Sequence, residues 1–211
     1  FLYTIEGTET IRDGWSKRLP SFEAEDVAVE NVYKFEEERY GNTVRRFLRF
    51  QNDEEHNLGE TPLPGGQINV FGTVGENHDL SFIGADRTKY IPLKHKVELD
   101  LGKASKVLVE PKVMDFRKKA LLFDNKGNVN GFNEIRDYRL TLKNFSDVAA
   151  ILEVTRNFPS PHWAIENADN PGDYEKVDQN TVKYTVTMEP HSEAHIKYTL
   201  TVYHGERRWN H

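Results

Sequence analysis

The sequence contains no cysteine. Disulfide bonds, thiolate metal sites and a cysteine nucleophile are therefore excluded from every interpretation of the chain. The absence leaves the cellular compartment open, because a β-domain of this size buries enough apolar surface to fold without disulfides. With 211 residues, the chain is long enough for one large β-domain or two domains of sandwich size.

An excess of basic residues is also missing. The chain has 28 Lys and Arg against 34 Asp and Glu, which gives a formal net charge of −6. Neither nucleic acid nor an anionic membrane surface attracts an acidic chain, so we expect no nucleic-acid partner. No apolar run approaches the roughly 20 residues that a membrane-spanning helix needs, and we expect no transmembrane segment.

Helical periodicity is nearly absent, and alternation of apolar and polar residues dominates instead. Only 36–40 and 146–150 hint at a helical turn, and both segments are too short to form a stable helix. Apolar and polar residues alternate along 138–142, 182–188 and 196–202. This period of two predicts antiparallel strands with one buried and one solvated face. The fold class is therefore expected to be all-β.

Turn signals recur about every 8–12 residues, a spacing that is typical of β-sandwiches and barrels. Tyr40-Gly41-Asn42 predicts a hairpin turn between two strand-like runs, and 73–78 predicts another. We expect two consecutive antiparallel β-sandwich units, at 1–104 and 105–211. The second unit is predicted to be immunoglobulin-like with about seven strands, the first two at 106–113 and 115–123. It lacks the cysteine pair of antibody domains.

The segment TPLPGGQINVFG, at 61–72, combines prolines with a pair of glycines. A phosphate-binding loop would need a helix and usually a lysine after the glycines. Here a strand pattern follows without a lysine, so we expect a tight corner. Gly65 and Gly66 are predicted to supply positive φ angles in a turn that the prolines begin.

The segment DNKGNVNGFNE, at 124–134, resembles a calcium-binding loop at first sight. Lys126 occupies the third position, where an EF-hand loop carries an oxygen ligand, and no helices flank the segment. A long hairpin loop is the favoured interpretation. A calcium site of another kind, formed by Asp124, Asn128 and Asn130, stays open as an alternative.

A second candidate site is the proline-stiffened loop NFPSPHW at 157–163. Phe158, His162 and Trp163 form an aromatic set that could stack on a sugar or on a protein partner. The alternative, which we favour, is that Trp163 packs into the sandwich core.

Acidic residues cluster at 52–57, where Asp53, Glu54 and Glu55 precede His56. A solvated loop is the favoured interpretation of this cluster. The chain shows no G-x-S-x-G or H-E-x-x-H motif, and we expect no cofactor. A hydrolase with dispersed acids, which would include Asp115, stays open because sandwich enzymes take their acids from distant strands.

The order of several segments resembles the C-terminal β-rich domain of unknown function in mucoidy-inhibitor-A-like proteins. The segments that carry the resemblance are PLPGGQINVF, FIGADR, LDLGKASKV and LKNFSDVAAILEV, and the similarity spans about residues 20–205. It implies a bacterial or archaeal protein that is often associated with the cell envelope, with further segments upstream. The chain begins with FLYTIEG, which agrees with a removed leader or with a downstream piece of a longer protein. The family implies no catalytic residues for this chain.

Together these features predict a non-catalytic interaction or structural module of a bacterial envelope-associated protein. We expect it in the periplasm or at the cell surface, while a cytoplasmic location stays open. Its partner would be a protein or an envelope polysaccharide, recruited by an exposed strand edge or by aromatic anchors. The alternatives are a carbohydrate-binding module that uses loop aromatics and the β-sandwich hydrolase described above.

Overall fold

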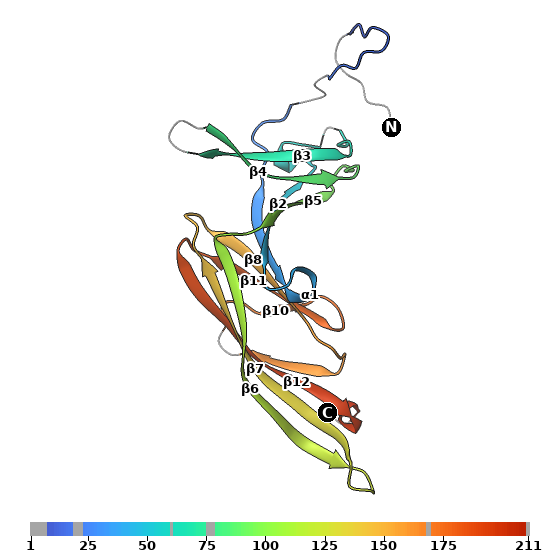
Figure 1. Cartoon of the computed structure of the whole chain (residues 1–211), viewed down its shortest axis with the longest axis vertical. Helices are drawn as coiled ribbons and strands as arrows, with labels where there is room; N and C mark the ends of the chain where they lie inside the picture. The colour runs from blue at the N-terminus through green and yellow to red at the C-terminus, as the bar shows by residue number, and fades with distance from the viewer. Residues whose placement is uncertain (1–7, 19–22, 60, 75–78, 168–169, 210–211) are drawn as a thin grey trace.

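The structure is a computed structural model, and it describes residues 8–18, 23–59, 61–74, 79–167 and 170–209. In this part of the chain the strands form sheets of six, four and two strands (Figure 1). Helical structure is limited there to the single turn α1 (Glu37–Tyr40) and the short 3-10 turns η1 (Glu54–His56) and η2 (Glu206–Arg208). The all-β, sandwich-like fold that the alternation predicts is confirmed. No helix among these residues is long and apolar enough to cross a bilayer.

The six-stranded sheet has the order β10-β11-β8-β1-β2-β5. Its strands are β10 (Tyr174–Lys176), β11 (Thr181–Met188), β8 (Ala150–Asn157), β1 (Glu30–Glu36), β2 (Val44–Gln51) and β5 (Lys96–Lys103). Neighbouring strands pair antiparallel except β1 and β8, which are parallel. Strands from both halves of the sequence therefore meet at the centre of this sheet.

The four-stranded sheet has the order β6-β7-β12-β9. Its strands are β6 (Val107–Phe123), β7 (Val129–Asn144), β12 (Ser192–Gly205) and β9 (Trp163–Asn167). The third sheet is the hairpin of β3 (Gly66–Val74) and β4 (Asp79–Thr88).

The main core lies between the six-stranded and the four-stranded sheets. Alternate side chains of the facing strands fill it, as the period of two requires. The largest fully buried side chains there include Phe35, Leu140, Leu152, Tyr184, Ile196 and Tyr198. A smaller cluster around Ile91, Val97 and Leu99 packs against Ile68 and Val70 of β3, and so attaches the β3–β4 hairpin to the sheet edge at β5.

The expected boundary at 104/105 falls in the turn between β5 and β6. The strands β1, β2 and β5 precede it, yet they share a sheet with β8, β11 and β10, which follow it. Residues before the boundary also enter the main core, among them Tyr33 and Val44. Strand pairing and side-chain packing thus connect the segments 1–104 and 105–211.

Two local expectations were wrong. Neither Gly65 nor Gly66 has a positive φ angle, and Gly66 already belongs to β3. What Gly65 supplies is close approach, because a Cβ atom there would lie 3.1 Å from the backbone nitrogen of Tyr90. In addition, 106–113 and 115–123 are not two strands, because β6 runs through both and Met114 forms a bulge within it.

Candidate functional site

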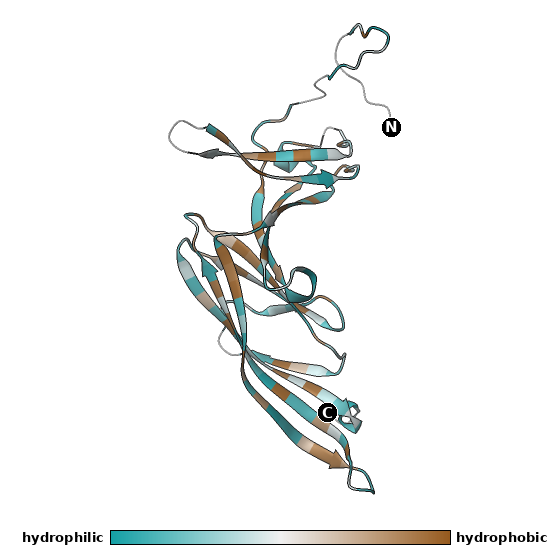
Figure 2. Ribbon diagram, in the orientation of Figure 1, coloured by the Kyte–Doolittle hydropathy of each residue, from teal (hydrophilic) through white to brown (hydrophobic). Residues whose placement is uncertain are grey.

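The most exposed apolar surface of the β6–β7 hairpin lies in the distal half of β6. The proximal half contributes Val107 and Val109 to the core. Beyond it, the hairpin projects past the end of the facing sheet, and apolar segments run along its tip (Figures 1 and 2). The exposed side chains are Val113, Met114, Phe116, Leu121, Phe123 and Val129. We call the segment 113–123 the distal edge.

The distal edge has one free side. In the sheet order, β6 pairs with β7 and has no described neighbour on its other side. The pairing with β7 is interrupted at Met114 and again at two register shifts between Lys119 and Phe123. Between them, Asp115 to Lys119 pair in register with Asp137 to Asn133. This regular stretch is the part of the edge that could accept a further strand.

One face of the distal edge, which we call the inner face, continues the side of the sheet that lines the core. Phe116 lies on it, opposite Arg136, and the Arg136 guanidinium carbon is 5.3 Å from the centre of the Phe116 ring. Lys118 makes a second contact of this kind, with its Nζ 4.5 Å from the ring centre of Phe132. Such cation–π contacts hold the cations over the rings and leave Phe116 half exposed, at 51%.

The opposite, outer face carries a small network of charges. Arg117 donates to Asp115 at 2.6 Å and to Asp137 at 2.5 Å, and Thr199 donates to Asp137 at 2.7 Å. The hydrogen bond from Arg117 lowers the pKa of the Asp137 carboxyl and holds it charged. Two carboxylates therefore share one guanidinium on this face.

The aromatic set of 157–163 is divided between core and surface. Phe158 is buried, and its ring centre is 4.9 Å from that of Trp163. Trp163 packs against the main core, and its indole nitrogen donates to the carbonyl of Gln179 at 3.0 Å. His162 contacts Trp209 instead, with ring centres 5.3 Å apart, and Trp209 is 78% exposed. The structure thus brings the buried Phe158 and the partly buried Trp163 together at the margin of the main core.

Asp124 and Asn128 lie in the loop that connects β6 to β7, whereas Asn130 is already part of β7. One oxygen of Asp124 accepts from the backbone nitrogens of Lys126 and Asn128, both at 2.8 Å. The other accepts from the Asn128 side chain at 3.1 Å, and this bond lowers the pKa of Asp124. Both carboxylate oxygens therefore stabilise the turn itself, and among the described residues no group of His, Asp and Glu is arranged to hold a metal ion.

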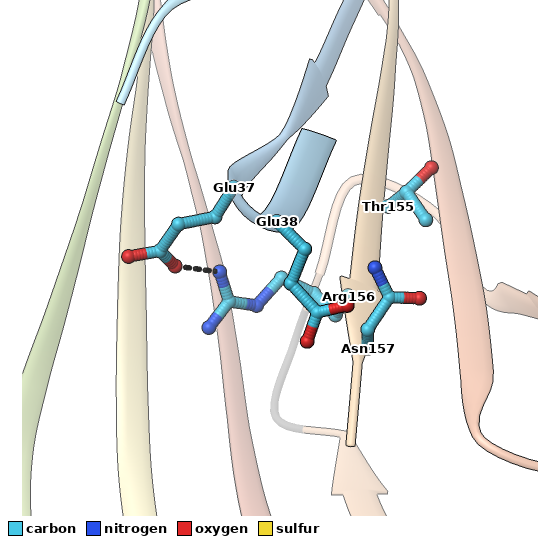
Figure 3. A pocket seen from close by; sticks show the side chains of 5 residues that line it. All are labelled: Glu37, Glu38, Thr155, Arg156 and Asn157. Atoms are coloured by element: carbon cyan, nitrogen blue, oxygen red, sulfur yellow. Dashed lines mark hydrogen bonds and ion pairs between the residues drawn. The ribbon is translucent and has the colours of Figure 1, made fainter. Parts of the chain in front are cut away.

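A shallow hollow of about 300 Å³ lies where α1 meets the end of β8. Figure 3 shows Arg156 in it, between Glu37 and Glu38. Arg156 donates to Glu37 at 2.9 Å and, through Nε, to the Tyr198 hydroxyl at 3.0 Å. The guanidinium therefore connects α1, β8 and β12, and we interpret its role as structural.

The acidic cluster at 52–57 lines a second hollow, of about 530 Å³, which Leu93 and Lys94 complete. Asp53 binds the imidazole of His56, with 2.6 Å between Oδ1 and Nδ1. Asp115 is placed elsewhere, on the outer face of the distal edge, where it pairs with Arg117. The structure does not bring the four candidate acids into one cleft.

Asn52 organises the loops around this second hollow. Its side chain is fully buried, donates to the carbonyls of Thr61 and Pro92 at 3.2 Å each, and accepts from the backbone nitrogen of Gly59 at 3.0 Å. Gly59 has a φ of +92°, and a Cβ there would lie 2.6 Å from the Cα of Asp53. The sequence gives no sign of this arrangement beyond an asparagine before an acidic run.

Replacing Asn52 by alanine should lower the free energy of unfolding by about 2 kcal/mol, because three backbone groups lose the partner that the buried Asn52 side chain provides. Urea unfolding measures this change. Asn125→Ala is the matched control, since Asn125 is exposed in the turn after β6. Equal stability of the two variants would contradict the organising role of Asn52.

Comparison with known proteins finds no matching family model, no matching curated protein and no matching solved structure. The resemblance to mucoidy-inhibitor-A-like proteins therefore stays a prediction. The candidate site has to be interpreted from its own geometry.

Proposed function

We propose that the chain is a non-catalytic interaction module, and that the free edge of β6 recruits a protein partner by strand addition. The module would belong to a bacterial envelope-associated protein outside the cytoplasm, as the resemblance implies. The observation that carries the proposal is the distal edge, which has half-exposed apolar side chains and no neighbouring strand among the described residues.

Solvation alone does not account for such an edge. Exposed strand edges are templates for pairing, and proteins usually shorten, charge or cover them. The distal edge is long and carries apolar groups, and concentrated exposed apolar groups mark interaction sites. In strand addition, backbone hydrogen bonds provide affinity and alternate side chains provide specificity.

Other features of β6 limit where a partner can pair. Pro111 lacks a backbone N–H, and the bulge at Met114 bends the strand. These features protect the proximal half from unspecific pairing and leave Asp115–Lys119 as the regular stretch. A partner strand is therefore expected to pair with the distal part of β6 and not with its proximal half.

A charge on the distal edge should weaken binding. We expect Phe116→Glu to reduce capture of the partner from an envelope extract about tenfold, because a carboxylate would have to be buried at the interface. The new side chain can pair with Arg136, so the fold should persist. Quantitative mass spectrometry of material retained by immobilised wild type and variant measures the effect.

Val177→Glu is the matched control, because Val177 is 53% exposed, as Phe116 nearly is, and follows β10 on the other sheet. It should retain the partner like the wild type. A partner that Phe116→Glu retains in full would overturn the proposed docking edge. A specific turnover activity of the purified chain would overturn the non-catalytic assignment.

A further inference from the structure

We propose that the occupant of the distal edge is a second copy of this chain. The two β6 strands would pair antiparallel about a twofold axis that passes beside Phe116. This inference rests on the proposed function, since it uses the same edge and names its partner. Charge complementarity of the edge with itself carries the proposal.

Symmetry restricts the registers that two copies can adopt. When a twofold axis stands perpendicular to a shared antiparallel sheet, one residue faces its own equivalent and the others pair symmetrically around it. Residues directly opposite each other project from the same face. The inner face of one copy therefore continues the inner face of the other.

The sequence of the regular stretch, Asp115-Phe116-Arg117-Lys118-Lys119, distinguishes these registers by charge. Centring the axis on any of the four charged residues of this stretch places two like charges directly opposite each other, which destabilises a strand pair. Centring it on Phe116 places Asp115 opposite the partner subunit's Arg117, twice by symmetry. This register has ion pairs on the outer face and no pair of like charges.

The inner face fits the same register. The axis brings Phe116 against the partner subunit's Phe116, and directly opposite aromatic residues stabilise a strand pair. Arg136 lies 5.3 Å from the Phe116 ring centre in each copy and would cover the ring pair from the side. The half-exposed surface of Phe116 thereby becomes buried.

On the outer face, the dimer adds ion pairs between the two copies that a single chain cannot form. In one copy, Asp115 and Asp137 share the guanidinium of Arg117. In the dimer each Asp115 also faces the partner subunit's Arg117, so the four carboxylates and two guanidiniums form one connected network. The two four-stranded sheets would become one continuous sheet across the axis.

Cross-linking tests the register directly, because the chain has no cysteine of its own. We expect the wild type to sediment as a concentration-dependent dimer. Phe116→Cys should form an intermolecular disulfide under mild oxidation, since opposite Cβ atoms in a strand pair lie about 4.5–5.5 Å apart, near disulfide geometry. Leu108→Cys, exposed on the proximal half of the same strand, is the matched control and should stay uncross-linked.

Charge reversal tests the outer face. Asp115→Arg alone should raise the dissociation constant of the dimer at least about tenfold, because it creates two pairs of like charges. Combining it with Arg117→Asp restores opposite charges and should return the constant to near the wild-type value. Glu175→Arg removes an ion pair with Lys183 at the far edge of the other sheet and should leave the dimer unchanged.

The outcomes separate this inference from the proposed function. A wild type that stays monomeric at all concentrations overturns the dimer, and it leaves strand addition standing if a different protein is captured and Phe116→Glu releases it. A dimer without the Phe116→Cys cross-link, or without rescue by the double reversal, overturns the register. A dimer with both results supports the two proposals together.

Discussion

Replacing Tyr198 by alanine should lower the free energy of unfolding by about 4 kcal/mol, the cost of deleting a large buried side chain. Tyr198 is almost completely buried at the centre of β12. Its ring stacks on Tyr138 at 5.0 Å and on Tyr184 at 6.1 Å between centres. Its hydroxyl accepts the hydrogen bond from Nε of Arg156. The substitution therefore leaves a cavity and an unpaired guanidinium nitrogen.

Urea or thermal unfolding measures this effect. Two control variants separate the loss of the ring from the loss of the hydroxyl and from a substitution outside the core. Tyr198→Phe keeps the ring stacking and removes the hydroxyl, so it should cost about 1–2 kcal/mol. Thr201→Ala lies on the outer face of the same strand and should change stability by less than about 0.5 kcal/mol. If Tyr198→Ala cost no more than Tyr198→Phe, the stacked tyrosines would contribute little to the core.

Alkaline solution should destabilise the fold through the same tyrosines. Burial raises the pKa of the Tyr198 hydroxyl from 10.0 to about 12, although Arg156 acts to lower it. Burial likewise raises the pKa of Tyr184. The pKa values of these tyrosines are raised in the folded state, so their contribution to folding stability is complete below pH 10. This contribution is lost as pH rises from about 10 to 12. For Tyr198 the loss is about 1.4 kcal/mol per pH unit, and Tyr184 adds to it.

Urea midpoints measured at several values between about pH 9 and 12 test this dependence. Tyrosinate absorbance should rise together with unfolding. In the double variant Tyr184→Phe/Tyr198→Phe the decline over this range should become shallower. Tyr203→Phe, a half-buried position on β12, is the control and should keep the wild-type decline. A double variant with an unchanged pH profile would show that other groups dominate alkaline unfolding.

The sequence predicts those strands whose burial follows from local alternation. Val182, Tyr184, Val186 and Met188 are all buried on β11, as the period of two requires. The same holds for alternate residues of β12 from Ile196 to Val202. Alternation works here because each strand has one face on the core and one in solvent.

The pairing of distant strands could not be predicted in this way. Nothing local in β1 indicates that Phe35 faces Val154 of β8 in a parallel register. That pairing depends on a long connection and on competition with every other strand. The division expected at 104/105 rests on the number and spacing of strand-like runs, which carry no information about sheet order.

The candidate site shows the same limit. The charged segment at 115–119 could be recognised as an edge-like sequence, but its long apolar continuation could not be placed outside the core from alternation alone. Trp163, by contrast, is a loop-flanking aromatic residue that packs against the core, because it lies opposite Val202 of β12. To place either the distal edge or Trp163, one must know which strand lies at the edge of the sheet and where the facing sheet ends.

The parallel pairing of β1 with β8 also orders events in time. A ribosome completes residues 30–36 long before residues 150–157 exist, so β1 and β2 must wait as a hairpin with apolar side chains uncovered. Contacts between residues this far apart in sequence slow folding. The entropy cost of closing the long loop has to be met before the contact can stabilise the chain. During that interval the nascent chain presents Val32 and Phe35 to its surroundings, and chaperone capture of the unfinished protein is the expected result.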